Sequence, residues 1–196
     1  MLIFRLFIAI DPPEDTINKL TFSINSLKDF TSPRIKWVNP ENIHLTLKFL
    51  GGIAENKIPS IINVLNFVSG KQVNFDLTLG KLGSFPNWRK ARIIWVGIEK
   101  SEKLNDLAKT LDMRFLSLGF PQETRPFSPH ITLGRVKENL NQKEYSTLEN
   151  ETKKAEKIYG HFTVRSICLY ESQLYANGPM YSLKYSAEFQ QATKPC

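Results

Sequence analysis

Residues 44–47 are His-Leu-Thr-Leu, and residues 130–133 repeat the pattern as His-Ile-Thr-Leu. Two of the three histidines in the chain lie in these two phrases. Successive side chains of an extended strand point to opposite faces, so each phrase sends an imidazole and a hydroxyl to one side and two apolar residues to the other. The repetition predicts a pseudo-symmetric site in which two bases and two small hydroxyl donors share one cleft.

The same alternation extends to the residues that follow each phrase. On the first strand Lys48 has the parity of the histidine and threonine, so it is an additional candidate for the cleft, while Phe49 falls on the apolar face. On the second strand Arg135 has the wrong parity to join the histidine, unless Gly134 permits a bulge or the strand ends there. Parity alone leaves the position of this arginine open.

Strand-like and helix-like segments alternate along the rest of the chain. Apolar residues at a period near 3.6 predict a helix after Pro12-Pro13 and further helices near 57–68 and 104–118. We expect strands at residues 2–10, 34–38, 43–50, 73–79, 91–98, 130–136, 161–170 and 180–189. Short connections between several strands suit hairpins, which predicts an α+β fold with largely antiparallel sheets and helices packed outside. No change of composition marks a linker, so residues 1–196 are expected to form a single domain of two intimate lobes.

Two segments have less definite patterns. Residues 83–90 are expected to form a loop, and Trp88 flanked by Arg89, Lys90 and Arg92 is a candidate patch for an RNA backbone, with a solvated basic loop as the alternative. Residues 139–157 are highly charged and weakly periodic, which predicts a solvated helix or a mobile excursion.

The composition is that of a soluble globular protein with a basic surface. The chain has 196 residues, with 26 Lys and Arg against 19 Asp and Glu, and a net charge of +7. This charge favours polyanionic partners such as RNA. No apolar run approaches the ~18 residues of a transmembrane helix, and Arg5 interrupts the apolar stretch 2–10, unlike a signal peptide. The two cysteines offer no disulfide framework or metal spacing, so we expect a cytoplasmic protein.

The paired histidines suit a reaction that needs a base at one atom and an acid at another. With an unperturbed pKa of ~6.5, one imidazole can be neutral while its partner is protonated. The threonine hydroxyls, Lys48 and Arg135 are donors suited to phosphate oxygens, which predicts phosphodiester chemistry. A catalytic zinc site is the competing use of the histidines, but such a site usually takes three protein ligands. Neither phrase contains an acidic residue, so a metal-free reaction is favoured over a metal site. Two core histidines bonded to the backbone are the remaining alternative, and the recurrence of the tetrapeptide in the same strand context favours a functional site over it.

Four segments also carry a family resemblance: 5–10 (RLFIAI), 44–51 (HLTLKFLG), 92–97 (RIIWVG) and 125–135 (RPFSPHITLGR). They resemble the two-histidine (2H) phosphoesterases and, within them, the RNA 2′,3′-cyclic phosphodiesterases, also called 2′-5′ RNA ligases. The resemblance implies a bilobal fold with two sheets flanking a central cleft. It also implies no metal and no cofactor, substrates that are RNA ends or cyclic nucleotides, and no membrane or protein partner.

The resemblance further implies that a 2′,3′-cyclic phosphate is opened to a 2′-phosphate. By this analogy His44 protonates the leaving 3′ oxygen and His130 activates the attacking water. The phosphate would be held by Thr46, Thr132 and Arg135, which favours the bulge at Gly134. The two halves are chemically near-equivalent, so the residues themselves do not decide which histidine is the acid.

Several alternatives stay open from the sequence. The same site is suited to the reverse reaction, in which RNA ends are joined through a 2′-5′ bond. A nucleotide-binding module without catalysis is a third hypothesis. Phe7, on the first expected strand, is a candidate for stacking on a base, and an ordinary core aromatic is the alternative.

Overall fold

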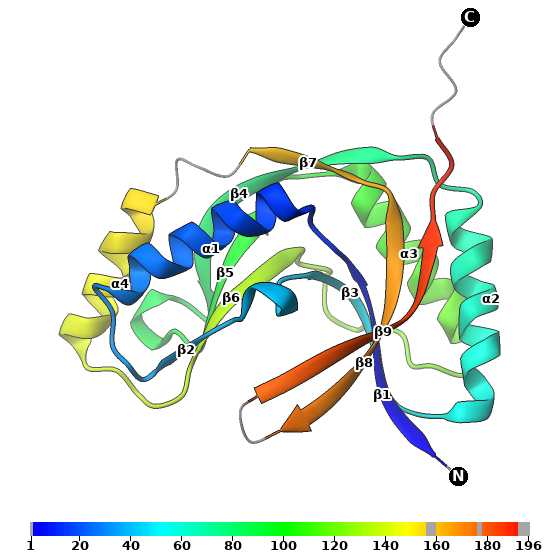
Figure 1. Ribbon diagram of the computed structural model, residues 1–196, viewed down its shortest axis with the longest axis horizontal. Helices are drawn as coiled ribbons and strands as arrows, with labels where there is room; N and C mark the ends of the chain where they lie inside the picture. The colour runs from blue at the N-terminus through cyan, green and yellow to red at the C-terminus, as the bar shows by residue number, and fades with distance from the viewer. Residues whose placement is uncertain (1, 156–159, 176–177, 192–196) are drawn as a thin grey trace, which may run out of the picture.

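The structure, a computed structural model, describes residues 2–155, 160–175 and 178–191. Within these residues nine strands form one sheet, in the order β7-β4-β5-β6-β3-β1-β8-β9, with β2 paired to β6 (Figure 1). All named strand pairs are antiparallel. The strands are β1 (Ile3–Ile10), β2 (Ile35–Trp37), β3 (Leu45–Ala54), β4 (Phe75–Phe85), β5 (Ile93–Ile98), β6 (His130–Val136), β7 (His161–Val164), β8 (Ser166–Tyr175) and β9 (Gly178–Glu188).

Four α-helices accompany the described part of the sheet: α1 (Glu14–Lys28), α2 (Ile58–Ser69), α3 (Glu102–Leu116) and α4 (Gln142–Ala155). Helices α2 and α3 pack on each other, α2 also contacts β8 and β9, and α3 contacts β3. Helix α4 packs against α1, β4 and the short 3-10 helix η3 (Trp88–Lys90). The two pairs of helices therefore lie at opposite ends of the curved sheet (Figure 1).

The strand order consists of two four-stranded halves, β7-β4-β5-β6 and β3-β1-β8-β9. They meet where β3 pairs with β6 through Leu45 and Ile131. The expected α+β fold with largely antiparallel sheets, two lobes and flanking helices is confirmed. The two expected sheets are joined edge to edge at this narrow contact, which lies inside the two histidine phrases.

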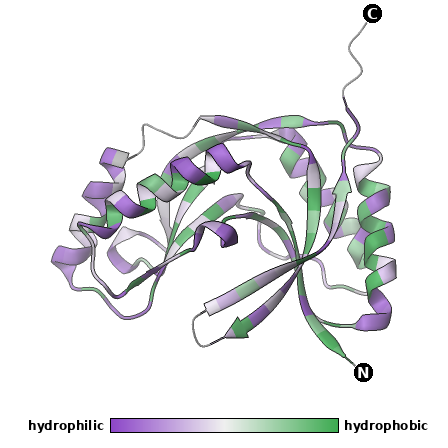
Figure 2. Cartoon of the chain, in the orientation of Figure 1, coloured by the Kyte–Doolittle hydropathy of each residue, from purple (hydrophilic) through white to green (hydrophobic). Residues whose placement is uncertain are grey.

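Helix α1 has the apolar stripe expected from its sequence. Leu20, Ile24 and Leu27 are at most 2% exposed and belong to the same core as strand residues Ile8 and Leu45. Helix α2 is predominantly hydrophobic in Figure 2, whereas α4 is predominantly hydrophilic. The difference follows from position, because α2 packs on α3 and on two strands of the sheet while α4 lies at its margin.

Two of the less definite segments differ from the expectation. Residues 83–85, expected in a loop, are the end of β4, and η3 follows them with Asn87 accepting a hydrogen bond from the backbone N–H of Arg89. Within 139–157, residues 142–155 form α4, which is not wholly solvated because Leu148 is fully buried with Ile94 in a second small core. The part of that segment from residue 156 onward lies outside the described residues.

Candidate active site

The two histidine phrases lie side by side at the centre of the sheet. Leu45 and Ile131 are paired and both are fully buried on the helix side. Because the pairing is antiparallel, this register sets His44 across from Thr132, and Thr46 across from His130. The two imidazoles and the two hydroxyls all project from the opposite side of the sheet. We call this side the histidine face, and it carries the side chains of His44, Thr46, His130 and Thr132.

Each imidazole is held by a backbone carbonyl two residues earlier in the chain. Nδ1 of His44 lies 2.7 Å from the carbonyl oxygen of Asn42. Nδ1 of His130 lies at the same distance, 2.7 Å, from that of Ser128. A carbonyl oxygen only accepts, so Nδ1 carries the proton in both rings, and Nε2 is the nitrogen that gains or loses a proton. Both rings thus have the same tautomer and are ready for proton transfer at Nε2.

The surroundings of His44 lower the pKa of its imidazole. Its Nε2 lies 3.0 Å from the hydroxyl oxygen of Thr46. Burial lowers the pKa of His44, and the hydrogen bond to Asn42 and the negative charge of Asp11 partly offset this effect. The positive charges of Arg135 and His130 lower the pKa of His44 to a smaller extent. The neutral form of His44 is therefore favoured in the free protein. The influence of His130 and Arg135 also indicates that the two halves of the site act on each other.

Aromatic rings support both histidines, in a similar manner on each side. The ring centroid of His44 is 5.0 Å from that of Phe7 and 5.2 Å from that of Tyr181, which meets it edge-on. His130 is 5.0 Å from Phe85, also edge-on, and 6.2 Å from Trp95. Tyr181 and Phe85 had no role expected from the sequence. Strand parity could have placed Trp95 on one face of its strand. Tyr181 comes from β9, and only the pairing of β9 with β8 decides which of its residues lie toward His44.

Arg135 lies on the histidine face because β6 contains a bulge. Trp95 of β5 pairs with Thr132, but the preceding Ile94 pairs with Gly134, so Leu133 is the extra residue. Gly134 has a further reason to lack a side chain, since a Cβ there would lie 2.8 Å from the ring of Trp37. The bulge expected near Gly134 is confirmed, and Arg135, which is exposed, joins the face of the histidines.

Lys48 is not on the histidine face, so this part of the parity prediction is wrong. Strand β3 has its own bulge: Ala9 of β1 pairs with Thr46, and the preceding Ile8 pairs with Lys48, which leaves Leu47 as the extra residue. The bulge turns Lys48 to the helix side, where its Nζ donates to Oδ1 of Asp112 at 2.5 Å. Lys48 is 4% exposed, so it is a structural cation and no donor to a phosphate.

We predict that Lys48→Ala lowers the free energy of unfolding by about 3 kcal/mol, because it leaves the carboxylate of Asp112 largely buried and unpaired. Chemical denaturation measures the change. The double variant Lys48→Met/Asp112→Leu is the control, and it should be closer to the unaltered protein, since neither charge remains. Unchanged stability together with weaker phosphate binding would contradict the structural role.

Phe7 is on the histidine face but is 3% exposed. Its ring is packed between the rings of His44, Phe49, Tyr170 and Tyr181. A base cannot stack on a ring that its neighbours already cover. The expectation that Phe7 stacks on a base is therefore wrong, and the alternative of a buried supporting aromatic holds.

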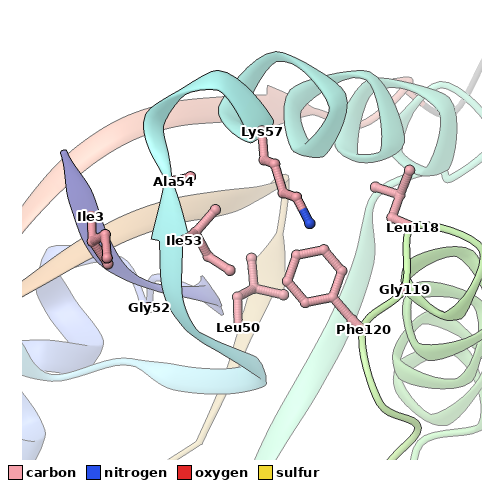
Figure 3. A pocket seen from close by; sticks show the side chains of 9 residues that line it. All are labelled: Ile3, Leu50, Gly52, Ile53, Ala54, Lys57, Leu118, Gly119 and Phe120. Carbon is pink, nitrogen blue, oxygen red and sulfur yellow. The ribbon is translucent and has the colours of Figure 1, made fainter. Parts of the chain in front are cut away.

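A separate pocket of about 360 Å³ is lined by residues that include Leu50, Ile53, Phe120 and Lys57, and it contains neither histidine of the repeated phrase (Figure 3). The described part of the chain has no group of three or more His, Cys, Asp or Glu side chains that could hold a metal ion. None of the described helices is long and apolar enough to cross a membrane.

Comparison with known proteins agrees with this geometry. The sequence profile of the 2′-5′ RNA ligase superfamily matches residues 11–175, a range that includes both histidine phrases. The chain belongs to the 2′-5′ RNA ligase superfamily. A relative from Methanothermobacter thermautotrophicus named RNA 2′,3′-cyclic phosphodiesterase is 35% identical, over 91% of this chain and 95% of its own. One of the same name from Thermotoga maritima is 32% identical, over 95% of this chain and 96% of its own.

Solved structures of similar proteins share the fold of this superfamily member. TT0787 of Thermus thermophilus superposes with a TM-score of 0.80 at 25% identity, covering 96% of this chain and all of TT0787. E. coli LigT complexed with 3′-AMP superposes with a TM-score of 0.76 at 26% identity, covering 97% of this chain and all of LigT.

Proposed function

We propose that the protein is an RNA 2′,3′-cyclic phosphodiesterase that opens the cyclic phosphate at an RNA end to a 2′-phosphate without a metal ion. The observation that carries the proposal is the pair of imidazoles with Nδ1 held by a carbonyl and Nε2 available for proton transfer, beside Arg135 on one face. Two relatives that align with this chain over more than nine-tenths of both sequences are named for this activity.

In the proposed reaction His130 takes a proton from water through Nε2, and the water oxygen forms a bond to phosphorus. The bond between phosphorus and O3′ breaks, and O3′ receives the proton of Nε2 of His44. The products are a 2′-phosphomonoester and a free 3′ hydroxyl, with one proton moved from water to the leaving oxygen. Acid and base are both needed, because neither water nor a ribose oxygen reacts readily without proton transfer.

His44 must be protonated to act as the acid, although burial lowers its pKa in the free protein. An anionic phosphate bound beside the ring stabilises the imidazolium and raises the pKa again. Substrate binding therefore favours the form of His44 that the reaction needs. Thr46, Thr132 and Arg135 are proposed to hold the phosphate oxygens, with the guanidinium stabilising the charge that develops on them.

Ligation of RNA ends through a 2′-5′ bond is the second candidate, since the superfamily carries that name. Ligation differs from hydrolysis in its nucleophile: the 5′ hydroxyl of a second RNA end takes the place of water at phosphorus, while O3′ leaves and accepts a proton as before. The same residues would therefore serve. We propose RNA ends and cyclic nucleotides as its substrates, and the cytoplasm as the place where it acts. The free and buried Cys168 suits a reducing compartment.

The test is turnover of 2′,3′-cyclic AMP by the purified protein in the presence and absence of EDTA, with the product identified by chromatography. We expect equal rates with and without chelator, and 2′-AMP as the product. A rate lost in EDTA and restored by zinc would favour metal catalysis. Formation of 3′-AMP would show that the bond from phosphorus to O2′ breaks instead of the bond to O3′. Binding without turnover would revive the non-catalytic module, and joining of tRNA halves would support ligation.

A further inference from the structure

Asn42 connects His44 to a distant strand of the sheet. Its carbonyl oxygen holds Nδ1 of His44 at 2.7 Å, and its side-chain Nδ2 donates to the carbonyl oxygen of Pro179 at 3.1 Å. Its backbone N–H donates to the carbonyl oxygen of Asn39 at 2.9 Å, in the short 3-10 helix η1 (Pro40–Asn42). The residue that holds the imidazole is therefore itself held by two further hydrogen bonds.

The partner of the Asn42 side chain belongs to the last strand of the sheet. In the strand order β9 lies three strands from β3, yet Pro179 reaches Asn42 and the ring of Tyr181 meets that of His44 edge-on at 5.2 Å. The curvature of the sheet (Figure 1) thus brings its edge strand back to the start of β3. An edge strand has backbone carbonyls without a partner in the sheet, and Asn42 binds one of them.

The two histidines differ in this support. Ser128, whose carbonyl oxygen holds Nδ1 of His130, is exposed and lies in the irregular segment 121–129. Asn42 is half-buried and ends a turn of 3-10 helix. A hydrogen bond weakens steeply as its angle departs from linear. The direction of the Asn42 carbonyl, which its other hydrogen bonds set, therefore decides how well it holds His44.

A well-directed carbonyl has two effects on His44. It fixes the tautomer and the orientation of the ring, so that Nε2 is the nitrogen presented to the reacting atoms. It also favours the protonated ring, because a hydrogen bond from a charged donor is stronger than one from a neutral donor. Both effects favour an acid, since the acid must hold a proton before the leaving oxygen accepts it.

We propose that Asn42 is a positioning residue for His44: its side-chain amide, bound to Pro179, fixes the carbonyl oxygen that orients the imidazole. The proposal rests on the proposed function, in which His44 gives a proton to the leaving O3′. It adds β9 to the elements on which this step depends. The Nδ1 of His130 is held by a different segment, so the effect is confined to the acid.

The test compares Asn42→Ala on 2′,3′-cyclic AMP and on its analogue in which sulfur replaces O3′. On the first substrate kcat should fall about tenfold with KM little changed, because the imidazole is less well oriented. On the second substrate the variant should match the unaltered protein, since a thiolate leaves without a proton. Asn42→Gln keeps the amide donor and should recover part of the loss.

Asn66→Ala is the matched control. Asn66 lies on α2, and its Oδ1 accepts a hydrogen bond from the hydroxyl of Tyr185 on β9. The variant therefore removes a hydrogen bond between an asparagine and β9 that does not lead to His44, and kcat should be unchanged. An equal fall of kcat in Asn66→Ala would overturn the positioning role. So would a fall of kcat in Asn42→Ala that is equal on both substrates, or absent on both.

A measurement without turnover separates this proposal from the proposed function. In an NMR titration of the imidazole signals, the pKa of His44 should be lower in Asn42→Ala than in the unaltered protein, because the hydrogen bond that favours the charged ring is weaker. Asp11, Arg135 and His130, the charged groups that act on His44, are the same in both proteins. If the unaltered protein does not turn over 2′,3′-cyclic AMP, the proposed function fails, and this shift would still support the positioning role. An unchanged pKa of His44 would reject it.

Discussion

Replacing either His44 or His130 by alanine should lower kcat for 2′,3′-cyclic AMP hydrolysis by ~10²–10⁴-fold, because each variant loses one positioned proton transfer. The double variant should be little worse than the single ones, since the two histidines act in one step. Steady-state kinetics measures the losses, and the unaltered protein should show a bell-shaped dependence of rate on pH. Both rings lie among aromatic neighbours, so the thermal unfolding of each variant is measured alongside its activity.

His161→Ala is the matched control for these variants. This third histidine is exposed at the start of β7, at the far end of the strand order, and its loss should leave the rate unchanged. A substrate in which sulfur replaces O3′ separates the two roles, since a thiolate leaves without a proton. His44→Ala should regain most of its activity on that substrate, and His130→Ala should not. Recovery by His130→Ala instead would exchange the acid and the base.

Replacing Arg135 by alanine should lower kcat/KM by ~10²–10³-fold, because the charge that develops on the phosphate oxygens loses its guanidinium partner. Arg135→Lys keeps the charge but lacks the two-pronged donor geometry, so it should recover only part of the loss. Steady-state kinetics with 2′,3′-cyclic AMP measures both.

Lys143→Ala is the control for Arg135, since it removes the same charge from an exposed position on α4. Its rate should equal that of the unaltered protein at the same ionic strength. An equal fall in Lys143→Ala and Arg135→Ala would show that net charge matters and a specific phosphate contact does not.

The sequence predicted most of the scaffold correctly, because its signals are local. The stripe of Leu20, Ile24 and Leu27 repeats at the helical period, and the histidine phrases alternate at the period of a strand. Residues 83–85 were misassigned to a loop, because Gly83 and the following prolyl segment resemble a turn. In the structure the space left by Gly83 is filled by the ring of Trp95, since a Cβ at Gly83 would lie 2.2 Å from that ring.

The presence or absence of a local sequence signal also explains which residues of the site were predicted correctly. The bulge in β6 had a local sign, a glycine at 134, and could be expected. The bulge in β3 had none, because Leu47 is an ordinary strand residue, so Lys48 and Phe49 were assigned to the wrong faces. The contribution of Tyr181 had no local sign either, since β9 reaches His44 only through the pairing of β9, β8, β1 and β3.

The sequence by itself determined the two histidine–threonine pairs, the strands that carry them and the presence of an arginine five residues after the second histidine. Only the tertiary structure decided which other side chains face them. A bulge is a mismatch of two residues against one on the neighbouring strand, so it is defined by pairing and not by the period of a single strand. That mismatch buried Lys48 with Asp112 and exposed Phe49 beside the histidines.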